Sequence, residues 1–303
     1  MAQIRALRKR MLAVRTIARI TKTMQMIATA KFTASLQRVR GTRPYTESIR
    51  TLVAEVSEAA GTVEHPLLRT VSEGARRELV LIISSDRGLC GAYNGNVLRA
   101  AERVVRPAID AGASVRVDVA GKKALAFCKF RKIDVVNRVV VGGKPTFAEV
   151  EAIAQRYIDG FVNGEYDLVR VAYMKFLSSA RQMPELMQLL PLTAAPAAAS
   201  ATGAASAAKE ESGEGQDNAL YEFTPDAKAI LDDLLPRSVK VALFQAINDA
   251  IVSEHAMRMV AMKSATDNAR GLGKSLNRQY NRARQAKITT ELTEIVSGAA
   301  ALE

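Results

Sequence analysis

The chain has 303 residues, which is enough for two modest domains or for one domain with an extended element. Its 48% hydrophobic and 24% charged residues are typical of a globular protein and exclude a disordered or fibrous chain. Two cysteines are too few for a disulfide framework and favour a reducing compartment, and no apolar run approaches the roughly 18–20 residues that a membrane span requires.

Most of the net charge of +12 lies at the N-terminus. Residues 1–50 hold twelve Lys or Arg against one acid, Glu47. So many like charges on one segment indicate an acidic partner. Nucleic acid is one candidate, because phosphates attract Lys and Arg directly. An acidic protein surface is the other, since aromatic residues are scarce here and the basic residues alternate with apolar ones. Composition alone leaves the two open.

The first 60 residues predict a long helix. Spacings of three and four connect the apolar residues Ile4, Leu7, Met11, Val14, Ile17, Ile20, Met24 and Ile27. Gly41 and Pro44 are the first breakers, and a kinked continuation to about residue 60 follows them. This unbroken helical pattern also argues against a mitochondrial transit peptide. Within residues 20–32, ITKTMQMIATAKF, the apolar side chains run almost all the way round, which is unusual for a surface helix.

Residues 75–224 have the alternation of an α/β domain. Short apolar runs begin at about residues 78, 114 and 135, helical stretches follow each of them, and residues 168–192 resemble further strands. This order favours a mainly parallel, Rossmann-like sheet. Residues 194–219 are rich in Ala, Ser, Gly and Glu and predict a flexible surface insertion.

Residues 225–303 return to a helical pattern. Proline is tolerated in the first turn of a helix, so we expect the helix to begin at Pro236 and to run towards Leu302. Its predicted stripe is Leu272, Leu276, Tyr280, Ala283, Ile288, Leu292, Ile295, Ala299 and Leu302. The simplest packing for two long terminal helices is an antiparallel coiled coil. The predicted fold is therefore a coiled coil of the N- and C-terminal helices plus a small α/β domain.

The stretch SSDRGLCGAYNG, residues 84–95, is the most enzyme-like part of the chain. Asp86, Cys90 and three glycines after a strand could hold a phosphate or present a nucleophile. The stretch has neither the Lys of a P-loop nor a nearby histidine base, so a tight strand-to-helix turn is the favoured interpretation. His255 stands alone on a helix, where a packing role is favoured over metal binding.

Three blocks closely resemble the gamma subunit of the F-type ATP synthase. They are the N-terminal pattern that ends in ITKTMQMIATAK, the stretch SSDRGLCGAYN, and the C-terminal SEHAMRMVAMKSATDNA with YNRARQAKITTELTEIVSGAAAL. The similarity covers the full length except residues 194–219. It implies a rotating central stalk that couples proton or sodium flow through F0 to ATP synthesis or hydrolysis at the alpha–beta sites. The gamma chain itself would then perform no bond chemistry and would need no catalytic residue, cofactor or metal.

The resemblance also implies partners and a location. The partners are the hexamer of three alpha and three beta subunits, the epsilon subunit and the ring of c subunits, with no nucleic acid. The location is the cytoplasmic face of the bacterial inner membrane, with membrane association only through F0.

The family's contact residues can be assigned to positions in this sequence. The expected contacts with the beta subunit are Lys22, Met24, Lys31, Arg284, Gln285, Thr289 and Glu291. The C-terminal residues Ile295, Ala299 and Leu302 should turn in an apolar bearing. Contact with the rotor ring is expected near Tyr221, Glu222, Phe223 and Thr224.

Overall fold

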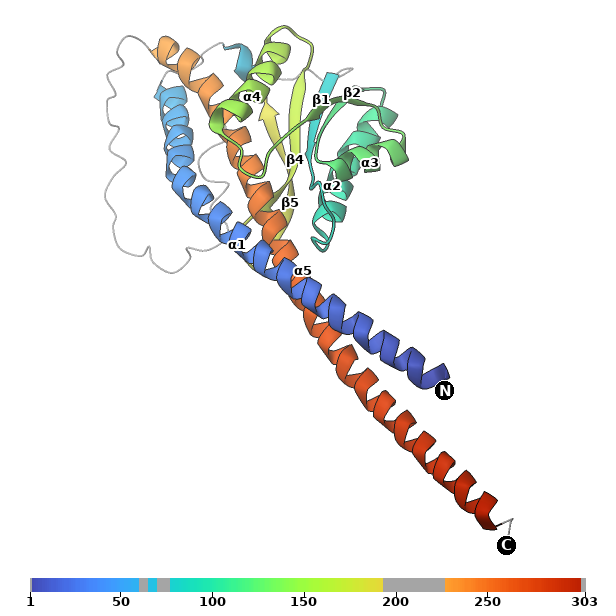
Figure 1. Cartoon of the computed structure of the whole chain (residues 1–303). Helices are drawn as coiled ribbons and strands as arrows, with labels where there is room; N and C mark the ends of the chain where they lie inside the picture. The colour runs from blue at the N-terminus through green and yellow to red at the C-terminus, as the bar shows by residue number, and fades with distance from the viewer. Residues whose placement is uncertain (1, 60–64, 70–76, 193–226, 301–303) are drawn as a thin grey trace, which may run out of the picture. The chain divides into compact units, whose positions relative to one another are not determined.

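The computed structural model describes residues 2–59, 65–69, 77–192 and 227–300 (Figure 1). Its elements, in chain order, are α1 (Ala2–Ala59), η1 (Pro66–Leu68), β1 (Arg77–Ile83), α2 (Tyr93–Asp110), β2 (Ser114–Ala120), α3 (Lys122–Arg131), β3 (Val135–Val139), α4 (Phe147–Val162), β4 (Leu168–Phe176), β5 (Gln182–Leu190) and α5 (Ala227–Ala300). They divide into two compact units. The first is formed by residues 1–32, 89–91 and 255–303, and the second by residues 33–88 and 92–254. Both long helices contribute to both units.

In the first unit, α1 and α5 pack against each other as an antiparallel pair (Figure 1). The hydroxyl of Thr266 donates a hydrogen bond of 2.8 Å to the hydroxyl of Thr21. Nearer the N-terminus, a Cβ added to Gly273 would lie 3.9 Å from Cγ1 of Val14. A step of seven residues back along α1 is thus matched by a step of seven forward along α5, which is the heptad spacing of a coiled coil. The predicted antiparallel coiled coil is confirmed.

The seam of α1 contains smaller residues than the sequence pattern suggested. The side chains of the first unit that are buried or half-buried at heptad spacing are Ile4, Leu7, Met11, Val14, Ala18, Thr21, Gln25, Ala28 and Phe32. Ile17, Ile20 and Ile27, which the predicted stripe placed in the seam, are 50%, 52% and 53% exposed, so that part of the prediction is wrong. The prediction followed large apolar residues, whereas a seven-residue repeat keeps positions such as 14, 21 and 28 against the partner helix.

The seam of α5 mixes small and large residues. Met262, Thr266 and Ala269 are buried at 4%, 1% and 8% exposure, and Leu276 follows at 7%. Leu272, predicted for the stripe, is 52% exposed. The neighbouring Gly273 faces Val14 instead, and a residue without a side chain allows the two helices to approach closely.

The second unit is built on a five-stranded sheet with strand order β3-β2-β1-β4-β5. The pairs β1–β2, β1–β4 and β2–β3 are parallel, and β4–β5 is antiparallel. The predicted mainly parallel sheet is confirmed, with one antiparallel strand at its edge. Every residue of β1 after Arg77 is buried, as expected for the central strand of a sheet that is covered on both faces.

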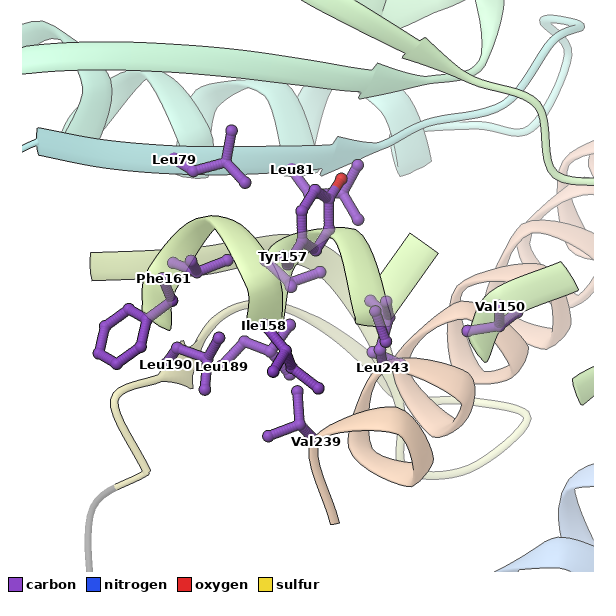
Figure 2. Close-up of a cluster of buried hydrophobic side chains, with 14 of the residues drawn as sticks. Leu79, Leu81, Val150, Tyr157, Ile158, Phe161, Leu189, Leu190, Val239 and Leu243 are labelled. Atoms are coloured by element: carbon purple, nitrogen blue, oxygen red, sulfur yellow. The ribbon is translucent and has the colours of Figure 1, made fainter. Parts of the chain in front are cut away.

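Helices α4 and α5 cover one face of this sheet. Figure 2 shows Leu79 and Leu81 of β1 above Tyr157 and Ile158 of α4, with Leu243 of α5 nearby. The phenol of Tyr157 also donates a hydrogen bond of 3.0 Å to Asp118 of β2, which lies on the same face. Side chains alternate along a strand, so the neighbouring β1 residues point to the other face, which α2 covers.

The start of α5 differs from the prediction. The helix begins at Ala227 and Pro236 lies inside it, so the predicted start at Pro236 is wrong. A proline inside a helix removes a hydrogen bond and costs about 3 kcal/mol or more. Fully buried leucines on both sides of it, Leu231 and Leu235 before Pro236 and Leu243 after it, pack into one core cluster. Burial of each stabilises the helix by roughly 1.5–3 kcal/mol and so offsets the proline.

A buried carboxylate lies on the same helix. Asp249 is 4% exposed, and Nε2 of Gln245 donates a hydrogen bond of 2.9 Å to its Oδ1. Burial raises the pKa of Asp249 to about 6, and the charges of Arg43 and Lys175 oppose this rise only in part. At neutral pH the group is therefore mostly ionised, although its buried environment favours the protonated form.

We predict that Leu235→Ala lowers the free energy of unfolding by about 3 kcal/mol, because it removes a fully buried side chain and leaves a cavity. Urea unfolding of the full chain measures this change. Leu177→Ala is the matched control: that side chain is 44% exposed and should change stability by about 0.5 kcal/mol or less. Equal losses in the two variants would contradict the assigned core.

A substitution at Gly121, between β2 and α3, tests how closely the backbone packs at this position. Its φ is +94°, and an added Cβ would overlap the backbone carbonyl of Ser84. Gly121→Ala should therefore destabilise the chain by about 3 kcal/mol or more. Gly164→Ala separates the steric overlap from the strain of a positive φ, since Gly164 has a φ of +73° but open space around it. Only the conformational cost of about 1–2 kcal/mol applies there. Thermal melts of the two variants should differ clearly, and coincident melts would exclude the overlap.

Asp249→Asn should make the chain more stable above pH 6. The folded-state pKa of Asp249 is higher than its unfolded value, so its contribution to stability is complete below about pH 4 and is lost as the pH rises through about 6. At pH 7.5 the asparagine variant should be more stable by about 2–3 kcal/mol, with a difference that shrinks towards pH 4.5. Urea unfolding across this range measures the difference. A wild-type chain that is more stable at pH 7.5 would mean that attraction to Arg43 outweighs burial.

Candidate functional site

The first group of predicted contact residues lies on α1. Lys22 and Lys31 are exposed and Met24 is half-buried. The amine of Lys22 contacts Oε1 of Gln25 at 3.4 Å, a weak intrahelical contact that leaves the charge at the surface. Lys22 and Lys31 are separated by about 2.5 helical turns, so they point to opposite sides of α1. A single flat partner surface could not contact both lysines.

Large apolar side chains surround these lysines on the surface of the pair. Ile17, Ile20, Met26 and Ile27 are between 50% and 62% exposed. Isolated exposed apolar residues are common on monomers, but a group of this size on a basic helix marks a surface that another chain covers. The predicted stripe included Ile17, Ile20 and Ile27, so their exposure at the surface was not predicted. The sequence did indicate an exposed apolar surface, because the apolar side chains of residues 20–32 run almost all the way round the helix.

The second predicted group lies on α5, where Arg284, Gln285, Thr289 and Glu291 are all exposed. The Thr289 hydroxyl donates to the Gln285 carbonyl at 3.1 Å, and Glu291 pairs with Lys287 at 3.2 Å. Arg284 lies 18 residues beyond Thr266, which is about 27 Å along the helix. The structure therefore does not bring the two predicted groups together. The first group forms a surface on α1, and the second forms a separate surface towards the end of α5.

The C-terminal end of α5 extends past the start of α1. In the register set by Thr21 and Thr266, Ala2 falls opposite Gln285, so the described residues of α1 do not reach the later residues of α5. All side chains from 288 to 297 are exposed. They include Ile288 at 53%, Leu292 at 61%, Ile295 at 72% and Val296 at 59%. Ile295 is thus on an exposed apolar tip. The side chain of Ala299 lies outside the described residues, as do Leu302 and the predicted rotor contacts Tyr221, Glu222, Phe223 and Thr224.

The enzyme-like stretch after β1 is a strand-to-helix turn whose polar groups bond to the chain itself. The backbone N–H of Ser85 donates to Asn94 Oδ1 at 3.0 Å, and that of Lys122 donates to Asp86 Oδ1 at 3.0 Å. Cys90 is 1% exposed. At Gly91, which has a φ of +59°, an added Cβ would lie 3.8 Å from Cβ of Ala261. The tip of this turn, residues 89–91, therefore packs with α5 in the first unit, a contact that sequence analysis did not anticipate.

His255 is a buried residue of α5. It is 8% exposed, and its pKa is lowered to about 4 by burial and by the nearby charges of Arg258 and Lys31. The ring is therefore neutral at physiological pH, as the favoured packing role requires. The described ranges contain no group of three or more His, Cys, Asp or Glu side chains that could hold a metal ion. Within the same ranges, no helix is both long and apolar enough to cross a bilayer.

Comparison with known proteins identifies the family. The ATP synthase family (ATP-synt) matches residues 3–302. The chain is 39% identical over 306 residues to the ATP synthase gamma chain of Rhodopirellula baltica, 37% identical over 303 residues to that of Leptospira biflexa and 35% identical over 303 residues to that of Haemophilus influenzae strain PittEE. Each alignment covers the whole of both chains.

Solved structures share the fold. A chain of the rotor of the Euglena gracilis mitochondrial ATP synthase superposes with a TM-score of 0.63, covering 95% of this chain and 99% of that one at 20% identity. A chain of the central stalk and c-ring of the Tetrahymena thermophila mitochondrial enzyme gives a TM-score of 0.58, covering 81% of this chain and 99% of that one at 20% identity. At this identity the likeness concerns the fold, and the family assignment rests on the full-length bacterial relatives. The chain belongs to the ATP synthase gamma chain family.

Proposed function

We propose that this gamma chain is a rotating shaft that couples ion flow through F0 to ATP synthesis or hydrolysis in a surrounding ring of alpha and beta subunits. The observation that carries the proposal is the outer surface of the coiled coil. Ile17, Ile20, Met26 and Ile27 are exposed among basic residues on α1, and an exposed apolar tip continues α5 beyond it. Such a surface fits a helix pair that is enclosed on all sides.

The chemistry of this surface suits a part that moves against its neighbours. Apolar contacts are non-directional, so one set can be exchanged for another without breaking hydrogen bonds of fixed geometry. Lysines on opposite sides of α1 can meet acidic groups on different subunits in turn. Shaft angle and nucleotide affinity would then be coupled reciprocally, because each rotor position favours one state of each catalytic site.

The residue roles follow the family assignment and are part of the proposal. Lys22, Met24 and Lys31 would contact acidic loops of the beta subunits. Arg284 and Gln285 would contact a second beta loop, with Thr289 and Glu291 beside them. All of these residues except the half-buried Met24 are exposed on α1 and α5, which is compatible with the contacts. Ile295, Ala299 and Leu302 would turn in an apolar bearing, where strong polar bonds would slow rotation.

The remaining partners and the location extend the proposal. The α/β domain, assigned to residues 75–224 between coiled-coil helices 1–60 and 225–303, would contact the epsilon subunit and, through residues 221–224, the c-ring. The bacterial relatives support a location at the cytoplasmic face of the inner membrane, where gamma would be a peripheral subunit that regulates the ATPase.

Purification of the complex tests the proposal. The tagged chain, expressed with the other subunits of its complex, should copurify with alpha, beta and epsilon chains. With the beta subunits fixed to a surface and a gold particle attached to gamma, the particle should rotate when ATP is added. A chain that purifies alone and binds DNA with a steep dependence on salt would contradict the proposal. So would an assembled, ATP-hydrolysing complex in which the particle stays still.

Met24→Lys tests the beta contact. The new ammonium group should pair with carboxylates of the beta subunit and add roughly 1 kcal/mol to the barrier between rotor positions. ATP-driven rotation and ATP synthesis should therefore slow by about fivefold. Leu177→Lys is the matched control, because it adds the same ammonium group at a 44% exposed apolar residue in the turn between β4 and β5, outside the coiled coil. Unchanged rates in the Met24 variant, or equal losses in both, would contradict the assigned contact.

A further inference from the structure

The edge of the sheet formed by β3 carries a groove that the shaft does not use. β3 is the last strand in the order β3-β2-β1-β4-β5, so it has one hydrogen-bonded neighbour, β2. A groove of about 450 Å³ lies between this strand and α3. Leu125, Lys129 and Lys132 form its helical side, and the consecutive residues from Ile133 to Arg138 form the other. Because these residues are consecutive, the groove follows the strand.

The outer edge of β3 can accept a further strand. An edge strand directs half of its backbone N–H and C=O groups away from its only neighbour, where an extended peptide can pair with them. The helix beside the groove supplies a second wall for the side chains of such a peptide. The apolar wall residues Leu125, Ile133, Val135 and Val136 suit apolar side chains, and Val136 is 52% exposed.

The charge of the groove selects for an acidic partner. Lys129, Lys132 and Arg138 line it, and Asp134 is its single acid. Within the described ranges none of these three cations has an ion-pair partner, in contrast to Arg131 next to them, which pairs with Glu102 at 2.8 Å. Three uncompensated cations around an apolar channel attract carboxylates that arrive with apolar side chains.

We propose that the groove between α3 and β3 binds an acidic, extended segment of another polypeptide, which pairs with β3 as an added strand. Apolar side chains at alternate positions enter the groove, and the carboxylates lie against Lys129, Lys132 and Arg138. This site is independent of the rotary shaft, because its residues lie in the second unit and at the outer edge of the sheet. An anionic membrane surface is the competing partner, but it offers no backbone to pair with the strand.

Fluorescence anisotropy with the full-length chain tests the site. The probe is a short fluorescein-labelled peptide in which glutamate and valine alternate. The double variant Lys132→Glu with Arg138→Glu should weaken its binding by about tenfold or more. Arg181→Glu is the matched control, because this exposed residue lies in the turn between β4 and β5, on the far side of the strand order, and should leave binding unchanged. Far-ultraviolet circular dichroism verifies that each variant is folded.

Two further measurements identify the binding mode. Two peptides are compared, each N-methylated at every second residue, but at opposite sets of positions. Only one of them should lose binding, because only one set of peptide N–H groups donates hydrogen bonds to β3. Bound peptide should slow amide hydrogen exchange in residues 135–139. The proposal is overturned by absent binding, by equal weakening in the Arg181 variant, or by unchanged exchange. Binding of phosphatidylglycerol vesicles, but not of the peptide, through Lys132 and Arg138 would assign the groove to membranes instead.

Discussion

The close approach of α1 and α5 is the constraint on which the functional surface depends. Small residues such as Ala18, Thr21, Ala28 and Gly273 occupy the seam, which allows the two helices to pack tightly. Ile17, Ile20 and Ile27 are thereby left on the outside. The same heptad repeat that joins the helices therefore creates an apolar surface for other subunits. An ordinary amphipathic pair would bury its isoleucines and present a polar surface to the solvent.

A different part of the same helix secures the second unit. The leucines of α5 from residue 231 to 243 belong to the core beneath the sheet, while residues from 255 to about 285 pack along α1. One helix of 74 residues contains both segments. Pro236 does not interrupt this continuity, since buried side chains on both sides of it keep the helix in place.

The turn after β1 illustrates how a motif can resemble an active site while serving the fold. Its glycines and its serine, aspartate and asparagine side chains could bind a ligand in another protein. Here Ser85 and Asn94 bond to each other, Asp86 accepts the N–H of Lys122, and Cys90 is buried. These bonds satisfy the turn, and its tip contacts α5 at Gly91. The glycine allows a left-handed conformation and a close contact at the same position.

Most of the secondary structure, the mainly parallel α/β sheet and the pairing of the terminal helices could be predicted from the sequence, because hydrophobic periodicity and strand–helix alternation are local properties. The concentration of positive charge in residues 1–50 was equally visible. Which side of each helix faces inward depends on tertiary packing. Ile17, Ile20 and Leu272 follow helical spacing as well as their buried neighbours do, and the register with the partner helix separates them. The continuation of the helix through Pro236 also depends on tertiary structure, because the contacts that offset the cost of the proline come from residues that are distant in the chain.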